Sequence, residues 1–248
     1  MEVHAHTHTP GKKWTHYLWE FLMLFLAVFC GFLAENQREH MVEQKREKEY
    51  IRSMIEDLKI DTVGLSLDNS LRKEAVIMHD SVITLLNKND RNQFEQQRIY
   101  YLARMGLRLS PFAKLNDRTY EQMKSSGNLR LVHNKEIADR ITKYYFNIKE
   151  LSVNNDQALL RLQSLIEYQG KVFNGAVFQE MVDIKNFSIT LPPGNPALIT
   201  KDKTILNELS VRIHYVLSIL LYSQNFISDL EKEASQLIEV LKKEYHLK

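Results

Sequence analysis

The chain has 248 residues, enough for one large or two small domains, and its 33 basic and 31 acidic side chains leave a formal net charge of +2. This balance argues against a nucleic-acid-binding protein that works through bulk positive charge. The single cysteine excludes a disulfide framework and any multi-thiolate metal site, and the low numbers of proline and glycine argue against an all-β protein rich in turns.

Residues 1–13 are predicted to be a flexible tail that contains alternate histidines, His4, His6 and His8. Imidazole nitrogens bind divalent metals, so these three side chains are weak candidates for a metal site. A flexible tail without a bound metal explains the same pattern. We expect no cofactor.

Residues 14–35 are predicted to form one transmembrane helix. The 21 residues of Trp14–Ala34 include a single formally charged side chain, Glu20. A helix of this length spans roughly 30 Å, about the thickness of the hydrocarbon core of a bilayer. Aromatic side chains favour the headgroup level, and three lie at the N-terminal edge as interfacial anchors: Trp14, Tyr17 and Trp19. A cleaved signal peptide or a buried core helix is the alternative interpretation.

One side of this helix combines small residues with two carboxylates. At helical spacing it carries Glu20, Leu24, Ala27, Gly31 and Glu35. Ala27 and Gly31 form a small-xxx-small pair, which lets two helix backbones approach closely in lipid. Because a charge that faces lipid is costly, Glu20 is expected to turn toward a protein partner or outward to the headgroups. We therefore expect this face to contact a second copy or a membrane-protein partner.

Residues 36–60 are predicted to form a charged helical stalk that continues the anchor into water. The stretch 35–59 holds 13 charged side chains, seven acidic and six basic, and little apolar surface. Four glutamates follow one another at four-residue steps: Glu35, Glu39, Glu43 and Glu47. They form a solvated face or, if several copies assemble about an axis, a ring that attracts cations.

Residues 61–248 are predicted to form an elongated antiparallel helical bundle, so the fold class is all-α. Three apolar series with the 3–4 spacing of coiled-coil-like packing begin at Leu71, Ile137 and Leu206. The apolar run 215–222 is too short for a second span and is interpreted as buried core. Three of the five prolines lie in 187–200, which predicts a non-helical insert there.

Local signals set the expected helix ends. Asn134 and Asp202 are predicted N-caps, and Gly127 is predicted to end a helix in the left-handed conformation. Within the apolar series, Asn155 is a polar residue that could fix the register of packing at some cost in stability. On that hypothesis, Asn155→Leu would raise the melting temperature.

The sequence contains no catalytic or metal-binding motif, and we expect no enzymatic activity. Neither a Glu-x-x-His pair for a di-metal site nor a nucleophile or phosphate-loop motif is present. The aromatic run of Tyr144, Tyr145 and Phe146 is expected to lie in the core rather than in a ligand cage.

Two blocks of the sequence carry a family resemblance. Residues 16–40 read HYLWEFLMLFLAVFCGFLAENQREH, residues 46–61 follow with REKEYIRSMIEDLKID, and residues 119–145 read TYEQMKSSGNLRLVHNKEIADRITKYY. These stretches resemble a group of uncharacterised single-span membrane proteins of Bacteroidota, which share an anchor, a charged stalk and a helical domain. The resemblance implies a single-pass protein of the inner membrane with a periplasmic helical domain. It implies no activity.

The leading functional hypothesis is a membrane-anchored helical scaffold that self-associates or docks a membrane-protein partner. Its expected partners are the lipid bilayer and a second copy or another membrane protein, and no nucleic acid is expected. The alternative is an ion-pathway or force-transducing subunit that uses the intramembrane Glu20. Counting basic residues on the two sides of 14–35 would instead leave the helical domain in the cytoplasm, so the sequence leaves the topology open.

Overall fold

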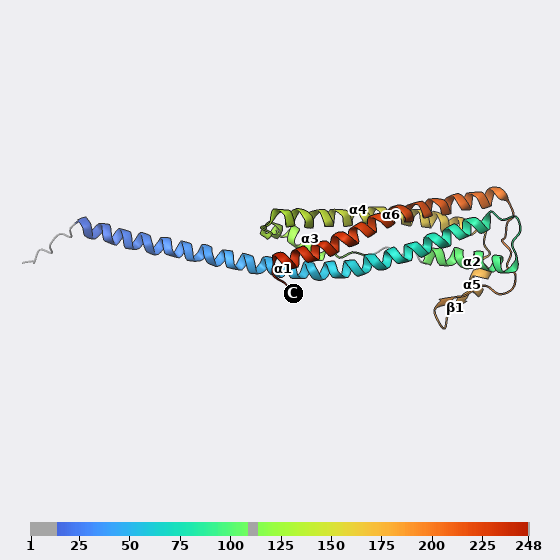
Figure 1. Cartoon of the computed structure of the whole chain (residues 1–248), viewed down its shortest axis with the longest axis horizontal. Coiled ribbons are helices and arrows are strands. Elements are labelled where there is room, and N and C mark those ends of the chain that lie inside the picture. Colours follow the sequence, from blue (N-terminus) through green and yellow to red (C-terminus); the bar gives the residue numbers. More distant parts are fainter. Residues whose placement is uncertain (1–13, 109–113, 248) are drawn as a thin grey trace, which may run out of the picture. The chain divides into compact units, whose positions relative to one another are not determined.

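The computed structural model describes residues 14–108 and 114–247 (Figure 1). These residues form six α-helices, one 3-10 helix and two strands of two residues each, which confirms the predicted all-α class. The predicted tail, with His4, His6 and His8, lies outside the described residues. The chain divides into two compact units, Met1–Glu49 and Tyr50–Lys248.

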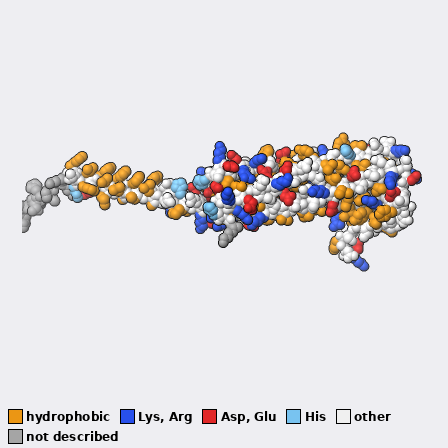
Figure 2. Space-filling model, in the orientation of Figure 1, with side chains coloured by type: hydrophobic (Ala, Val, Ile, Leu, Met, Phe, Trp, Pro, Cys, Tyr) orange, Lys and Arg blue, Asp and Glu red, His pale blue; other side chains and the backbone are white. Residues whose placement is uncertain are grey.

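Helix α1, Trp14–Leu86, is a single uninterrupted helix of 73 residues that contributes to both units. No proline occurs within it, so every residue can take part in the helical hydrogen-bond ladder. Within the first unit its side chains from Trp14 to Val42 are all exposed. Figure 2 shows hydrophobic side chains along the N-terminal part of this stretch and few along the part that follows.

Helices α4, Lys135–Gln169, and α6, Lys203–Glu244, lie side by side and run in opposite directions (Figure 1). At one end the Asn134 side chain donates a hydrogen bond of 2.9 Å to Glu244. At the other end the Tyr168 hydroxyl donates one of 2.8 Å to Glu208. Their shared apolar faces follow the predicted series closely.

Helix α1 runs parallel to α4 within the second unit. Tyr144 donates a hydrogen bond to Asp61, and Arg72, eleven residues further along α1, donates one to Asn155, eleven residues further along α4. The shorter elements complete the unit: α2 at Gln93–Arg108, α3 at Arg118–Ser125, the 3-10 helix η1 at Asn128–Leu131 and α5 at Gly175–Glu180.

Two apolar clusters hold the second unit together. One joins α1 residues such as Met54 and Leu58 to the N-terminal half of α4 and the C-terminal half of α6. The other joins the C-terminal end of α1 to α2, the C-terminal half of α4 and the N-terminal half of α6. Ile213, Val216 and Leu220 lie in this second cluster. Tyr215 and Tyr222 are exposed, so only one side of the run 215–222 belongs to the predicted buried core.

The second half of the predicted stalk differs from the sequence-based expectation. Ile51, Met54, Ile55 and Leu58 are buried in the first apolar cluster. The boundary between the two units lies after Glu49 rather than after residue 60. Charged side chains alternate with these apolar residues along the helix. A count of charged residues over the whole stretch therefore does not reveal that one face of the helix is apolar.

The predicted helix ends are confirmed at three positions. The Asn134 side chain accepts hydrogen bonds from the backbone N–H groups of Glu136 and Ile137, and that of Asp202 accepts one from Thr204. Gly127 has φ of 70°, the left-handed conformation expected after α3. Each of these signals acts within a few residues, so the sequence alone reveals it.

The non-helical stretch between α5 and α6 contains a small antiparallel hairpin. Its strands are β1, Val182–Asp183, and β2, Ser188–Ile189, with Val182 opposite Ile189. The rest of this stretch runs along α2 without regular structure, where Gln97 and Tyr100 donate hydrogen bonds to the carbonyls of Pro192 and Ala197. The irregular region therefore includes the predicted 187–200 insert and begins several residues before it.

Candidate functional site

The N-terminal part of α1 is long and apolar enough to cross a membrane. By length and composition, two of the described helices meet this criterion, α1 and α6. In α1 none of the most apolar stretch is buried, whereas 33% of the corresponding stretch of α6 is buried. Partial burial is ordinary for a core helix, and α6 packs along its length against α4.

The five residues of the predicted interface face all lie in α1. At 100° per residue, Glu20, Leu24, Ala27, Gly31 and Glu35 fall on one side of the helix. All five are exposed. A Cβ atom added at Gly31 would meet no atom within 4 Å, so this side of the helix is open to a close approach by another backbone.

Glu20 has a partner on its own helix that the sequence analysis missed. Its Oε1 lies 3.0 Å from His16 Nε2, one turn earlier, and both side chains are about half exposed. An imidazole N–H so placed can donate to the carboxylate, and a protonated imidazole would balance its charge. The four-residue spacing of the two side chains was the available signal.

The other carboxylate of the face, Glu35, is also paired. Arg38 donates to it through Nε at 2.9 Å and through a second guanidinium nitrogen at 2.5 Å, and both side chains are exposed. The first step of the predicted glutamate series is therefore balanced by an arginine on the same helix. This contact favours the solvated-face interpretation at Glu35. Glu47, the last glutamate of the series, is only 6% exposed, so the predicted solvated face does not extend to it.

Aromatic side chains lie on a different side of the same helix. Phe21, Phe25 and Phe29 stack in sequence, with ring centroids 6.3 and 5.9 Å apart. At helical spacing this row is centred roughly a third of a turn from the face that carries Ala27 and Gly31. The predicted interfacial anchors are exposed, like every other side chain of this part of the helix: Trp14, Tyr17 and Trp19.

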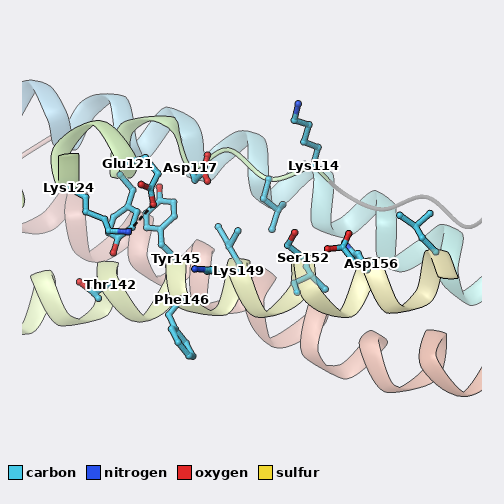
Figure 3. A pocket seen from close by; sticks show the side chains of 16 residues that line it. Lys114, Asp117, Glu121, Lys124, Thr142, Tyr145, Phe146, Lys149, Ser152 and Asp156 are labelled. Carbon is cyan, nitrogen blue, oxygen red and sulfur yellow. Dashed lines mark hydrogen bonds and ion pairs between the residues drawn. The ribbon is translucent and has the colours of Figure 1, made fainter. Parts of the chain in front are cut away.

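A groove of the second unit lies between α4 and the segment that contains α3 (Figure 3). It has a volume of about 760 Å³ and is lined by three lysines and three acidic residues besides apolar side chains. Glu121 and Lys124 form an ion pair of 3.3 Å along one wall, and Tyr120 stacks on Tyr145 with centroids 4.3 Å apart. Positive and negative side chains both line its walls, so the groove does not present a surface of one charge to a ligand.

A buried polar cluster fastens the segment before α3 to α1. Asp61 accepts hydrogen bonds from the backbone N–H of Asn116 at 2.7 Å and from the Tyr144 hydroxyl at 2.9 Å. Asp57, fully buried, accepts from the side chains of Asn116 and Thr119. Burial raises the pKa of Asp61 to about 6 despite these donors, and the neighbouring Asp57 adds to the increase.

The aromatic run of α4 is only partly in the core. Tyr144 and Tyr145 are buried as predicted, and burial raises the pKa of both hydroxyls. Phe146 is 66% exposed, so its predicted core position is wrong. The next residue along a helix points 100° away, which carries Phe146 off the packed side.

Among the described residues, no group of three or more His, Cys, Asp and Glu side chains is arranged to hold a metal ion. The three histidines of the tail fall outside these residues. Cys30 is an exposed free thiol within the apolar part of α1.

No protein family, curated protein or solved structure matches this chain. The resemblance to single-span membrane proteins therefore remains an expectation from the quoted sequence blocks.

Proposed function

We propose that this protein is a single-pass scaffold of the inner membrane that self-associates through its anchor. Residues 14–35 of α1 would span the bilayer, and the second unit would act as an antiparallel helical bundle that holds copies in register. The proposal assigns it no catalytic role and no cofactor.

One observation carries this proposal: the open, small-residue face of the exposed apolar stretch at the N-terminal end of α1. Ala27 and Gly31 lie one turn apart on that face, and apart from the adjoining backbone of α1 no described atom lies within 4 Å of a Cβ placed at Gly31. In lipid, helices associate through close backbone packing where small residues allow it. A second copy of the same helix presents the same small face and can pack against it symmetrically.

The distribution of side chains around α1 supports a defined lipid side and a defined protein side. The stacked phenylalanines present large apolar rings on one side, which suits contact with acyl chains. Glu20 lies on the other side with His16, where burial against a partner would remove the carboxylate from lipid.

Cysteine cross-linking along the span tests this proposal. In a Cys30→Ser background, single cysteines at positions 24, 27 and 31 should form disulfide-linked dimers efficiently in membranes. Cysteines at positions 22, 25 and 29, the matched controls on the remaining sides of the helix, should not. Cross-linking without periodicity would mean that the helix stands alone in lipid, and the self-association proposal would then be wrong.

A membrane-protein partner on the same face is the other form of this proposal. In that case the cysteines at 24, 27 and 31 would link to a chain of different mass rather than to a second copy. Mass spectrometry of the cross-linked product separates the two forms.

The alternative function, an ion pathway, rests on the His16–Glu20 pair. Two titratable side chains 3.0 Å apart in an apolar helix could exchange a proton. Glu20→Gln should then abolish proton flux in reconstituted vesicles while leaving the span cross-links unchanged. Equal flux in wild type, Glu20→Gln and protein-free vesicles would eliminate the ion-pathway alternative.

The side of the membrane that holds the second unit is a separate part of the proposal. We favour the periplasmic side, following the family resemblance, against the count of basic residues. A cysteine at the exposed position 187 in the Cys30→Ser background should react with a membrane-impermeant maleimide in intact spheroplasts. Reaction only after lysis would place the second unit in the cytoplasm.

A further inference from the structure

The hairpin between α5 and α6 presents two large apolar side chains to solvent. Phe187 is 85% exposed and Ile184 is 69% exposed, and both belong to the turn that joins β1 to β2. Figure 1 shows this hairpin extending beyond the helices of the second unit. Single exposed apolar side chains are common, but two at the tip of one projecting turn form a compact apolar knob.

The turn is held in one conformation by a single carboxylate. Asp183 accepts hydrogen bonds from the backbone N–H groups of Lys185 and Asn186 at 3.0 and 3.1 Å and from the Asn186 side chain at 2.7 Å. These donors lower the pKa of Asp183. A turn ordered before binding loses little conformational entropy when it docks.

Phe187 also occupies a strained backbone conformation. Its φ is 49°, in the left-handed region that disfavours bulky side chains. Folding alone would favour glycine or asparagine at this position. An aromatic ring that is held outward at such a cost points to a binding role for the ring.

An apolar groove that could accept these two side chains lies along α4 of the same unit. It has a volume of about 650 Å³, and its floor and walls include Leu107, Leu159, Leu160 and Ile166. Leu160 and Ile166 are 61% and 54% exposed. Asp156 also lines the groove, whereas the hairpin carries Lys185 beside the two exposed apolar side chains.

We propose that the hairpin tip of one copy docks into the α4 groove of a second copy. Phe187 and Ile184 would enter the groove, and Lys185 would lie near Asp156 of the other chain, so the charges as well as the apolar surfaces match. The two surfaces are different patches of the chain, so two copies can exchange them reciprocally about a two-fold axis. This arrangement is compatible with symmetric packing of the two anchors.

This contact buries too little area to be stable between copies that are free in solution. A buried aromatic side chain contributes roughly 200 Å², and two apolar side chains fall well short of the roughly 800 Å² per partner of a stable interface. The contact therefore needs a high effective concentration, which anchoring of the copies in one bilayer provides. In this respect the inference rests on the proposed function.

Mixed cross-linking of the full chain in membranes tests this inference. Two variants in the Cys30→Ser background, Phe187→Cys and Leu160→Cys, should form a disulfide-linked dimer when co-expressed, and neither should do so efficiently alone. Val153→Cys on the same helix and Ile199→Cys after the hairpin are matched controls at similarly exposed positions, 55% and 56%. A pair of variants in which either cysteine is at a control position should give at least tenfold less disulfide-linked dimer.

Two sets of variants separate docking from folding. Phe187→Gly relieves the backbone strain, so its melting temperature should not fall, yet it should lower the yield of a Lys185→Cys and Asp156→Cys cross-link several-fold. Lys185→Glu and Asp156→Lys should each weaken the 187–160 cross-link, and the two together should restore it.

Failure of this inference differs from failure of the proposed function. Loss of the 187–160 link with retained links at positions 27 and 31 overturns the hairpin contact alone. An intrachain disulfide in a Phe187→Cys, Leu160→Cys double variant, without links between chains, would show that the hairpin folds onto its own groove and would also overturn it.

Discussion

The side-chain carbonyl of Asn155 on α4 accepts a hydrogen bond of 2.8 Å from the guanidinium of Arg72 on α1. Arg72 is fully buried and also donates to both carboxylate oxygens of Asp68, at 3.0 and 3.1 Å. Asn155 is thus one member of a charged network that joins two helices. The sequence-based hypothesis treated it as an isolated polar residue in an apolar series.

This network reverses the predicted effect of Asn155→Leu. Removing an acceptor from a buried charged donor should cost roughly 1.5–3 kcal/mol, so the melting temperature should fall rather than rise. Thermal unfolding followed by circular dichroism measures the change. Val153→Leu, at an exposed position two residues away, should leave the melting temperature nearly unchanged. A higher melting temperature for Asn155→Leu would show that the hydrogen bond contributes no net stability.

The second apolar cluster should be sensitive to cavities. Ile213 and Leu220 are at most 1% exposed, so replacing either by alanine should lower the free energy of unfolding by about 2–5 kcal/mol. Leu221→Ala, at a position 44% exposed, is the matched control and should cost about 0.5 kcal/mol or less. Urea denaturation provides the values. Equal losses at positions 220 and 221 would contradict the described packing of α6.

Two buried groups should make opposite contributions to the pH dependence of stability. Burial raises the pKa of Asp61 from 3.8 to about 6, so the folded state binds this proton more readily than the unfolded state. Its contribution to the free energy of unfolding therefore rises as the pH falls from 7 to 4. Burial lowers the pKa of His79 from 6.5 to about 4, so its contribution falls over the same interval. Each contribution amounts to at most roughly 3 kcal/mol.

Single variants should separate these two contributions. His79→Gln should be more stable at pH 5 than at pH 7.5, and Asp61→Asn should show the reverse with a steeper loss in acid than wild type. His214→Gln, at an exposed position, should keep the wild-type profile. Unfolding by urea at a series of pH values gives the comparison. Parallel profiles for Asp61→Asn and His79→Gln would contradict the opposed titrations.

The boundary between the two units predicts how the chain tolerates truncation. A fragment 46–248 keeps the core residues Ile51, Met54 and Leu58 and should give a helical circular dichroism spectrum with cooperative unfolding. A fragment 61–248, cut at the boundary expected from sequence, loses these residues and should unfold without a cooperative transition. Similar melting temperatures for the two fragments would show that residues 50–60 are dispensable for the fold.

The parts of the fold that the sequence predicted are those encoded locally. The caps at Asn134 and Asp202 and the left-handed Gly127 depend on neighbouring residues, and the apolar series of α4 and α6 repeat at the helical period. Burial of residues 51–58 depends on α4 and α6, which lie far away in the chain, and composition could not reveal it. The Arg72–Asn155 hydrogen bond joins residues 83 positions apart and was hidden for the same reason.

The candidate site shows the same division. The face that carries Ala27 and Gly31 follows from helical spacing alone. The pairing of Glu20 with His16 could have been predicted from the same spacing. The exposed Phe187 could not be predicted, because a strained φ and a turn organised by Asp183 are properties of the folded hairpin.

The mass of the full chain in detergent or lipid nanodiscs tests the central claim, self-association through the anchor, most directly. Light scattering that separates the protein mass from that of the lipid should give a multiple of 29.2 kDa for wild type. Gly31→Leu fills the open face and should shift the population toward a single copy, whereas Phe29→Leu on the stacked aromatic side should not. A strictly monomeric wild type, or an oligomer that Gly31→Leu leaves intact, would contradict association through this face.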